Sequence, residues 1–314
     1  MPVSVPEDLR AIAAPYEFKP FRNYRAFSSS VQLDVLVAEL SEIFLSPDAI
    51  VCVAGQGSAR SVAIGRRLPW DSEFFGVPMG KIDYVLGADH TMRAEALRLI
   101  AGEFRARKIR HVATRADAAD SAMINALQDC GFRLRGATAT YVARPNREPA
   151  RLTRMYGQVR AFAQDDAAEL IDLASQSFDQ FENRFRADPH LPPGRARAFY
   201  QEWAQQCVTG QMAELILVSE GREKKLLGFI ALRKLQPVSA VAPRPIYGGG
   251  LGAAHVRARG AYAGLLHHAV NWAHERSGVA EVQTPVQNIP VIKLYEAIGL
   301  RFRNLSYAFH HWRE

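Results

Sequence analysis

The sequence predicts an α/β protein built from two similar halves, each with a mixed central β-sheet flanked by helices. A chain of 314 residues fits two domains of roughly 100–200 residues. Segments with strand signals and segments with helix signals alternate along it. The segment 121–134 can be laid over 289–302, and both copies run from a helix through a glycine into an extended segment.

Composition and charge limit the classes of protein to which the chain can belong. Hydrophobic residues make up 48% and charged residues 23%, as in a globular chain with a sizeable core. No apolar run approaches the roughly 18–20 residues that span a bilayer, and the N-terminus lacks the features of a signal peptide. We therefore expect a soluble, cytoplasmic protein without a membrane partner.

The net charge of +7 does not indicate nucleic acid, because the arginines are scattered and no run of five basic residues occurs. An anionic small molecule is the better interpretation. The cysteines Cys52, Cys130 and Cys207 are far apart and form no CxxC or Cys/His cluster. This excludes a typical zinc site and a disulfide framework and predicts three reduced thiols.

The first half contains five segments with clear signals. A β-branched run closed by glycine predicts a strand at 49–55. Apolar residues at helical spacing predict helices over 91–108 and 121–132. A short strand is expected between them at 111–116, and an extended segment follows at 133–145.

Prolines mixed with charge at 144–155 indicate a linker, so we place a boundary near residue 150 and predict domains over 1–150 and 151–314. The second half repeats the alternation more fully. Its expected helices cover 165–178, 195–208, 258–278 and 289–299, and its expected strands cover 213–220, 225–235, 246–256, 279–286 and 305–312.

The two copies of the repeat differ where chemistry is expected. The first copy has Leu127 where the second has Tyr295, and no Arg-Gly turn precedes the long helix of the first half. We interpret 1–150 as a degenerate domain and expect one ligand site per chain, in 151–314.

The turn before the helix at 258–278 has the composition of an anion site. Arg257-Ala258-Arg259-Gly260 lies between a glycine-rich strand and a long amphipathic helix. Unpaired amides at a helix N-terminus bind phosphate oxygens, and Gly260 permits close approach of the backbone. The alternative is a glycine-capped helix start with solvated arginines.

Two segments in this order resemble the acyl-CoA-binding core of the GNAT superfamily of N-acetyltransferases. The turn at 257–262 matches the pyrophosphate loop Q/R-x-x-G-x-G/A except at Tyr262, where the superfamily has Gly or Ala. The segment from Asn288 to Gly299 is similar to the Asn-to-Tyr helix that follows one strand later. The resemblance implies two GNAT-like halves, the second binding an acyl-CoA, most simply acetyl-CoA, as co-substrate. The implied cofactor residues are Val256, Arg257, Arg259, Gly260, Ala261, Tyr262, Ala263, Gly264 and Asn288.

Nearly the whole chain further resembles the dTDP-fucosamine acetyltransferase branch of this superfamily. The resemblance lies in LPWDSEFFG at 68–76, RFRADP at 184–189, YQEW at 200–203 and AVNWA at 269–273. It implies N-acetylation of a nucleotide-linked amino sugar in the assembly of a surface polysaccharide or glycoside.

Acetyl transfer needs a positioned amine, donors for the oxyanion and a proton for the departing thiolate. We expect backbone N–H groups of 246–256 to donate hydrogen bonds to the oxyanion. We predict Tyr295, two turns into its helix, as the proton donor; the alternative is a tyrosine packed on the sheet. Asn288 either only caps that helix or also binds a water or the CoA arm.

The acceptor is expected between the first helix and first strand of the second half. We predict that Arg184 and Arg186 bind a diphosphate, since guanidinium groups hold phosphate oxygens at two points. Asp188 would then fix Arg184 or a sugar hydroxyl. The alternative is a solvated basic segment in which Asp188-Pro189 is a plain turn.

No general base is evident. Asp179, Glu182 and Glu281 are candidates, with a solvated or structural carboxylate as the alternative for each, and the histidines show no metal-ligand spacing, so no metal is expected. Two rival functions stay open: an acyltransferase for another amine, small molecule or protein, and a non-catalytic acyl-CoA-binding scaffold. We expect a small-molecule amine as partner, and a monomer or a homodimer.

Overall fold

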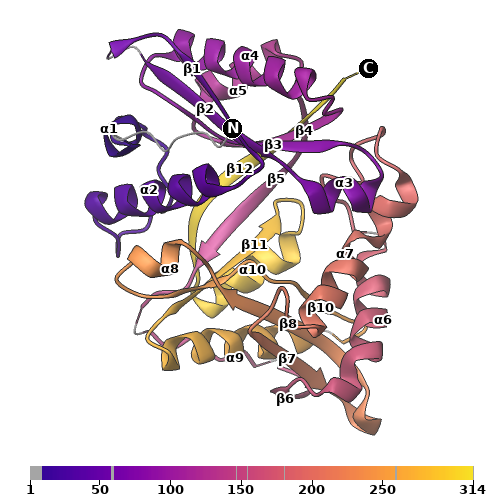
Figure 1. Cartoon of the computed structure of the whole chain (residues 1–314). Helices are drawn as coiled ribbons and strands as arrows, with labels where there is room; N and C mark the ends of the chain where they lie inside the picture. The colour runs from indigo at the N-terminus through magenta and orange to yellow at the C-terminus, as the bar shows by residue number, and fades with distance from the viewer. Residues whose placement is uncertain are drawn as a thin grey trace. The chain divides into compact units, whose positions relative to one another are not determined.

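The structure, a computed structural model, describes residues 9–57, 60–145, 147–153, 155–179, 181–258 and 260–313. The chain forms two compact units (Figure 1). The first comprises the described residues of Met1–Thr138, Asn183–Pro192 and Asn304–Glu314, and the second those of Ala139–Glu182 and Pro193–Arg303.

The first unit contains a mixed sheet in the order β1-β2-β3-β4-β12-β5. β3 runs parallel to β4, while the pairs β1/β2, β2/β3 and β12/β4 are antiparallel. The last strand of the chain therefore pairs with a strand of the first half of the sequence, from Ser306↔Asp117 to Trp312↔His111. The strands are β1 (Ala49–Ala54), β2 (Ser61–Arg67), β3 (Met79–Leu86), β4 (His111–Asp117), β5 (Arg133–Val142) and β12 (Arg301–Trp312).

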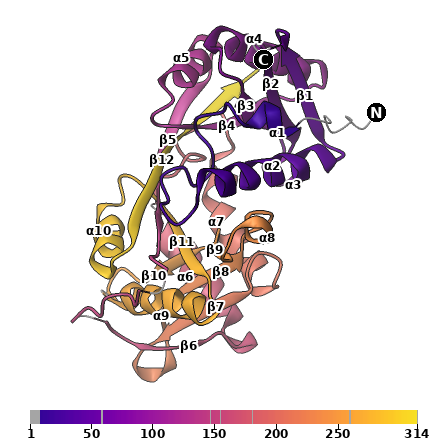
Figure 2. The same ribbon diagram turned by 90° about the vertical axis from the view of Figure 1, so that its left-hand side faces the viewer.

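Helices cover both faces of this sheet (Figure 2). α4 and α5 bury Ile100 and Leu127 in a cluster with Ala63 of β2, whereas α1 and α2 bury Leu36 in a cluster with the adjacent Ile64. Because alternate residues of a strand point to opposite faces, β2 contributes to both clusters. The helices are α1 (Leu9–Ala13), α2 (Ser29–Leu45), α3 (Pro69–Phe75), α4 (His90–Ala106) and α5 (Ser121–Asp129).

The second unit contains a sheet in the order β5-β11-β9-β8-β7-β6, with β10 paired to β8. Its strands are β6 (Gln158–Ala161), β7 (Leu215–Glu220), β8 (Leu226–Lys234), β9 (Ile246–Gly248), β10 (Gly252–Ala254), β11 (Val279–Pro285) and the end of β5. Its helices are α6 (Ala167–Phe178), α7 (Pro193–Val208), α8 (Val238–Val241), α9 (Ala261–Glu275), α10 (Ile289–Ile298), and the 3-10 turns η2 (Gln164–Asp166) and η3 (Arg222–Lys224).

The sheet of the second unit also has a helix layer on each face. Phe229 and Ala231 of β8 pack in one cluster with Leu170 and Ala204 of α6 and α7. The intervening Ile230 points to the other face, where α9 lies against β7, β8 and β11.

The predicted α/β class with mixed, helix-flanked sheets is confirmed, and the strongly patterned elements form within a few residues of their expected bounds. Four elements were not predicted from the sequence: α2, β2, β3 and β6. The boundary near residue 150 stays a prediction, because the compact units are interleaved along the chain.

Cys52, Cys130 and Cys207 are free thiols, as predicted. Within the described part of the chain, no helix combines the length and the apolar character that a bilayer span requires.

Candidate active site

A β-bulge interrupts the strand that the sequence predicts at 246–256. β9 and β10 pair with β8 in registers that differ by one residue, so one extra residue lies between them. Gly249 has a φ of 63°, and a Cβ on Gly250 would lie 1.6 Å from the carbonyl oxygen of Ala231. The Gly-Gly-Gly run of the sequence is therefore what allows the strand to bend here.

The bend leaves one edge of β10 open. Among the described residues, the parallel ladder of β9 and β11 ends after two residue pairs. Leu251 and His255 form backbone hydrogen bonds with β8. Because such bonds alternate along an antiparallel strand, the backbone groups of Gly252 and Ala254 point to the opposite edge. An extended ligand with amide groups could pair there like an added strand.

The N-terminus of α9 lies just beyond this edge in the chain and has no side-chain cap. Gly260 is the N-cap residue, in a left-handed conformation with φ 96°. Arg257 is exposed and Val256 is 84% exposed, so the turn faces solvent. Arg259 lies outside the described residues. An uncapped helix N-terminus beside a free guanidinium suits a phosphate.

The other predicted residues of this turn fix the helix on the sheet. Ala261 and Ala263 are 0% and 4% exposed, and a Cβ on Gly264 would lie 3.5 Å from Val159 of β6. Their small size lets the helix approach the sheet closely. Any contact of theirs with a ligand would therefore come from the backbone.

The corresponding helix of the first unit, α4, begins differently. Its N-cap Asp89 accepts a hydrogen bond from the backbone N–H of Met92 at 2.8 Å. A carboxylate thus occupies the helix terminus, where it repels an anion. The buried Leu127 of α5 stands in the place of Tyr295. Both features support the prediction of one acyl-CoA site per chain.

Two tyrosines lie close together on the α9 face of the sheet. Tyr295 of α10 is 1% exposed, its hydroxyl donates to the backbone oxygen of Gln283 at 3.4 Å, and the Tyr262 phenol is near enough to affect its pKa. The Tyr262 ring lies against Gly252, since a Cβ there would be 2.8 Å from it. Tyr262 thus points from α9 toward β10. Burial raises the pKa of both phenols, that of Tyr295 well above its ordinary value.

Asn288 is the N-cap residue of α10, as its position predicts, but its side chain does not cap the helix. Its side-chain amide donates to the Thr284 hydroxyl at 3.0 Å, and its carbonyl accepts from Ile292 N–H at 3.1 Å. These bonds hold the start of α10 at the end of β11. A contact of Asn288 with a cofactor stays a prediction.

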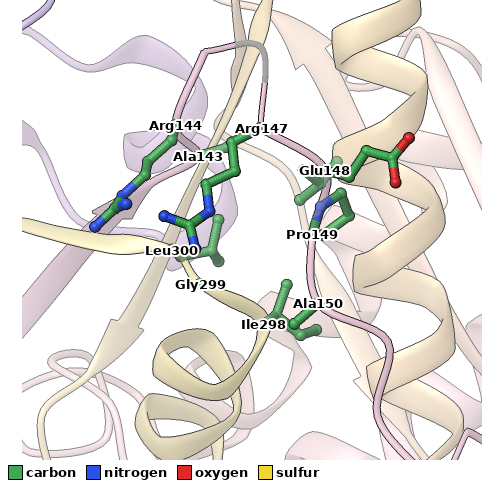
Figure 3. Close-up of a pocket in the computed structure, with 10 residues that line it drawn as sticks. Ala143, Arg144, Arg147, Glu148, Pro149, Ala150, Ile298, Gly299 and Leu300 are labelled. Atoms are coloured by element: carbon green, nitrogen blue, oxygen red, sulfur yellow. The ribbon is translucent and has the colours of Figure 1, made fainter.

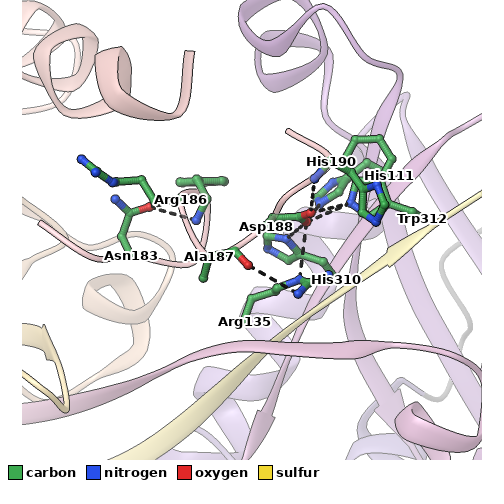
Figure 4. Close-up of polar contacts among 10 residues, drawn as sticks. His111, Arg135, Asn183, Arg186, Ala187, Asp188, His190, His310 and Trp312 are labelled. Atoms are coloured by element: carbon green, nitrogen blue, oxygen red, sulfur yellow. Dashed lines mark hydrogen bonds and ion pairs between the residues drawn. The ribbon is translucent and has the colours of Figure 1, made fainter. Parts of the chain in front are cut away.

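The predicted acceptor residues lie in the first unit, on the segment Asn183–Pro192. The Asn183 side-chain oxygen accepts from the backbone N–H groups of Phe185 at 2.9 Å and Arg186 at 3.3 Å, which curls the segment (Figure 4). Arg184 and Arg186 are half-buried on either side of the buried Phe185. The predicted cofactor residues that the structure describes lie in the second unit.

Asp188 anchors this segment within the first unit. Its carboxylate accepts from His310 Nδ1 at 2.6 Å and from Trp312 Nε1 at 2.8 Å, and Arg135 Nε lies 3.7 Å away (Figure 4). The Asp188 side chain is fully buried. This environment fits a structural role that holds Arg184 and Arg186 in place. A direct bond from Asp188 to a sugar stays a prediction.

The charge state of this cluster follows from its contacts. Burial alone would raise the pKa of Asp188, but the nearby His111 imidazole and hydrogen bonds from His310 and Trp312 hold that pKa well below its usual range. Burial lowers the pKa of His310 to about 4, so a neutral His310 donates through Nδ1. Ligand atoms of His111, Asp188 and His310 lie within 4.8 Å of one another. A cation there would face the Arg135 guanidinium, so the geometry favours a hydrogen-bonded network over a metal site.

One acidic residue near Arg184 was not predicted. Burial raises the pKa of Asp71 in α3, and the Arg184 charge opposes that rise. The rings of Phe75 and Phe185 pack with centroids 5.2 Å apart and hold α3 against the segment. The signal in the sequence is the LPWDSEFFG segment, but nothing in it assigns Asp71 a role.

The three candidate bases gain no support. Glu281 is 4% exposed and its carboxylate lies 3.1 Å from Arg303 Nε, which fits the structural alternative. Asp179 and Glu182 follow the end of α6, and the Glu182 backbone carbonyl accepts from Gln287 at 3.2 Å.

A cavity of about 220 Å³ in the second unit lies at the C-terminal end of α10, the opposite end from Asn288 (Figure 3). Arg144 and Arg147 line it, while the Glu148 carboxylate points away from both guanidinium groups. Of the predicted cofactor residues that the structure describes, none lines this cavity. It is a separate feature from the open strand edge.

Known proteins were compared with the chain by sequence. No family model matches it. It is 30% identical over 143 residues to the dTDP-fucosamine acetyltransferase of Escherichia coli O6:H1 (strain CFT073), covering 45% of this chain and 58% of that protein. It is 25% identical over 150 residues to the spore coat polysaccharide biosynthesis protein SpsD of Bacillus subtilis (strain 168), covering 47% of this chain and 48% of that protein. The matches thus span about half the length of these relatives.

Solved structures extend the likeness over the whole chain. A GCN5-related N-acetyltransferase from Sphaerobacter thermophilus matches 98% of this chain and 94% of its own with a TM-score of 0.62 and 13% identity. A tandem GNAT protein from the clavulanic acid biosynthesis pathway matches 97% of this chain and 93% of its own, with a TM-score of 0.52 and 14% identity. The chain thus has the tandem fold of the GNAT N-acetyltransferases, and it resembles the dTDP-fucosamine acetyltransferases in sequence.

Proposed function

We propose that the protein is an N-acetyltransferase that transfers the acetyl group of acetyl-CoA to the amine of a nucleotide-linked amino sugar. One observation carries this proposal: an open strand edge runs from an uncapped helix N-terminus to a pair of tyrosines, all within the second unit. A phosphate site, a strand-like pairing edge and a proton donor in this order suit a pyrophosphate, an amide-containing arm and a thioester.

The residues present fit acetyl-CoA. The turn at Gly260 has a left-handed backbone and no side-chain cap, which suits a pyrophosphate, and the exposed Arg257 lies three residues before it. The backbone groups of Gly252 and Ala254 would pair with the pantetheine arm and hold the thioester carbonyl. When bound, acetyl-CoA supplies the activated acetyl group.

The amine attacks the carbonyl directly in this proposal. The C–N bond forms, the C–S bond breaks, and the electron pair of that bond goes to sulfur. The tyrosine pair supplies the proton that sulfur requires. The amine loses a proton to solvent in this proposal.

The acceptor assignment is supported by the curated relatives, one named for dTDP-fucosamine and one for a spore coat polysaccharide. Arg184 and Arg186 are the proposed ligands of the diphosphate, on a segment that Asn183 and Asp188 hold in shape. A reaction that consumes acetyl-CoA and a nucleotide sugar would take place in the cytoplasm, which we propose as the location.

The test compares one amino sugar in two forms, free and linked to a nucleoside diphosphate, with acetyl-CoA as donor. We expect kcat/KM to be at least about 100-fold higher for the linked form, because remote binding energy positions the amine. Equal efficiency for both forms would contradict the nucleotide-sugar assignment and favour an acyltransferase of another amine.

A further inference from the structure

The cavity at the C-terminal end of α10 combines an apolar floor with two cationic side chains. Its floor is formed by buried residues of the second unit: Ala143, Val270, Ile298 and Leu300. Arg144 and Arg147 line it from the loop that follows β5, and the Arg147 guanidinium extends from that loop toward the segment 298–300 (Figure 3). An apolar surface with a few polar groups is the usual composition of a small-molecule site.

The loop that carries the two arginines is fixed at both ends. The backbone N–H of Ala143 donates to the carbonyl oxygen of Ala280 at 2.8 Å. The backbone N–H of Ala150 donates to the carbonyl oxygen of Ile298 at 2.9 Å. These two bonds attach the loop to β11 and to the end of α10, so that its arginines lie beside the cavity.

Neither guanidinium is neutralised by the described part of the chain. No described carboxylate forms an ion pair with Arg144 or Arg147, and the Glu148 carboxylate points away from both (Figure 3). Two positive charges that line one cavity repel each other, and an anion bound there would offset the repulsion.

The carbonyl groups at the end of α10 do not account for the arginines. Three of the last four carbonyl oxygens of this helix already accept hydrogen bonds from backbone N–H groups. Leu300 donates to Tyr295 at 2.9 Å, Gly299 donates to Glu296 at 3.0 Å, and Ala150 donates to Ile298. The helix end is therefore capped by the main chain, and the guanidinium groups remain available to a ligand.

The corresponding helix end in the first unit is filled by side chains. There Gly131 and Phe132 stand in the places of Gly299 and Leu300. The Phe132 ring packs against the His311 ring with centroids 5.0 Å apart, and a Cβ on Gly131 would lie 3.5 Å from His311. Among the described residues, no atom lies within 4 Å of a Cβ on Gly299. The space is thus particular to the second unit.

The volume limits the size of the ligand. A cavity of about 150 Å³ lined by apolar side chains holds a benzene molecule, whereas sites for drug-sized ligands have roughly 300–1,000 Å³. The cavity of about 220 Å³ therefore has room for one ring and one anionic group, and is too small for a nucleotide.

We propose that this cavity is a binding site for a small organic anion. Its carboxylate would accept hydrogen bonds from Arg144 and Arg147, and its apolar body would lie against Val270, Ile298 and Leu300. The site is separate from the open strand edge and does not depend on the proposed function.

The test compares benzoate with benzamide, which has nearly the same shape and no charge. Saturation-transfer NMR on the full chain measures the Kd of each compound. We expect benzamide to bind at least about tenfold more weakly than benzoate, because hydrogen bonds to a charged acceptor are stronger than those to a neutral one. Arg144→Gln and Arg147→Gln should each weaken benzoate by about tenfold for the same reason. Arg222→Gln on the η3 turn removes the same charge elsewhere and should leave the Kd of benzoate unchanged.

Leu300→Phe tests the floor of the cavity. It gives position 300 the side chain that Phe132 has in the first unit, and it should abolish benzoate binding by filling the space. Thermal unfolding is measured alongside. If this variant does not fold, the two arginine variants, whose substitutions lie on the loop, still decide the question.

Three results would overturn the inference: no detectable binding of benzoate, equal Kd values for benzoate and benzamide, or a wild-type Kd of benzoate in both arginine variants. Displacement of benzoate by acetyl-CoA would also overturn it, since the probe would then occupy the turn at Gly260. The proposed function fails in a different way. Wild-type protein that is neither stabilised by acetyl-CoA nor able to acetylate any amine would contradict that function, whatever benzoate does.

Discussion

Gly260→Asp places a side chain and a negative charge where the proposed pyrophosphate meets the N-terminus of α9. Gly260 has φ 96° and no side chain caps the turn. A helix N-terminus favours an anion by typically 0.3–1 and at most about 2 kcal/mol. A carboxylate about 4 Å from a phosphate charge adds repulsion of about 1 kcal/mol in water and about 4 kcal/mol near a protein surface.

Together these effects are worth about 2–5 kcal/mol, which corresponds to an affinity roughly 30-fold to several thousand-fold weaker. The matched control is Gly210→Asp. Gly210 also has a left-handed backbone, with φ 79°, and no atom lies within 4 Å of a Cβ there. The control thus adds the same charge and a similar backbone strain at the end of α7, away from the proposed site.

The assay is thermal denaturation with increasing acetyl-CoA. A ligand at about 100 times its Kd stabilises the native state by about 2.7 kcal/mol, and Gly260→Asp should lose most of this gain at the same concentration. Gly210→Asp should keep it. A folded Gly260→Asp protein that responds to acetyl-CoA like wild type would refute the phosphate-binding role of this turn.

Two further predictions concern the first unit. Arg184→Ala and Arg186→Ala should each raise the acceptor KM by about tenfold or more and leave the acetyl-CoA KM nearly unchanged. Steady-state kinetics checks this, with Arg222→Ala on the η3 turn as control, and an unchanged acceptor KM for both variants would remove the diphosphate assignment. His310 has a pKa of about 4 in the folded protein and an ordinary pKa of 6.5 in the unfolded chain. Between these two pH values the unfolded state binds more protons, so the stability of the folded protein falls as the pH drops from 6.5 to 4. His310→Asn cannot be protonated and keeps an N–H donor for Asp188, so its urea-unfolding free energy should lose roughly 2–3 kcal/mol less than wild type between pH 7 and pH 4. Parallel pH profiles for the two proteins would contradict this.

The start of α9 could be predicted from the sequence, because a Gly before a long apolar-faced helix has a limited set of backbone solutions. The structure places the N-cap there, at Gly260. The bulge at Gly249 was not predicted, since 246–256 was expected to form one continuous strand.

Features made by distant residues could not be predicted in this way. Asp188 accepts hydrogen bonds from His310 and Trp312, which are 122 and 124 residues away in the sequence. No local sequence pattern therefore shows that its carboxylate is already hydrogen-bonded within the protein. The pairing of β12 with β4 is also a long-range event. Tyr262 did stand out as a departure from a motif, but only the structure shows that its ring turns toward Gly252.

Helix α2 went unassigned for a different reason. Its buried residues Val35, Leu36, Leu40, Ile43 and Phe44 have helical spacing, but the neighbouring V-x-L-x-V alternation obscures that period. The Ser28 side chain, which accepts from Val31 N–H at 3.3 Å, is the start signal that would have revealed it.

Calorimetric titration of the wild-type chain with acetyl-CoA shows whether the second half alone has a working acyl-CoA site. Asp89 caps α4 in the first unit, whereas no side chain caps α9 at Gly260 in the second. We expect a stoichiometry of one acetyl-CoA per chain. No binding, or two equivalent sites per chain, would contradict it.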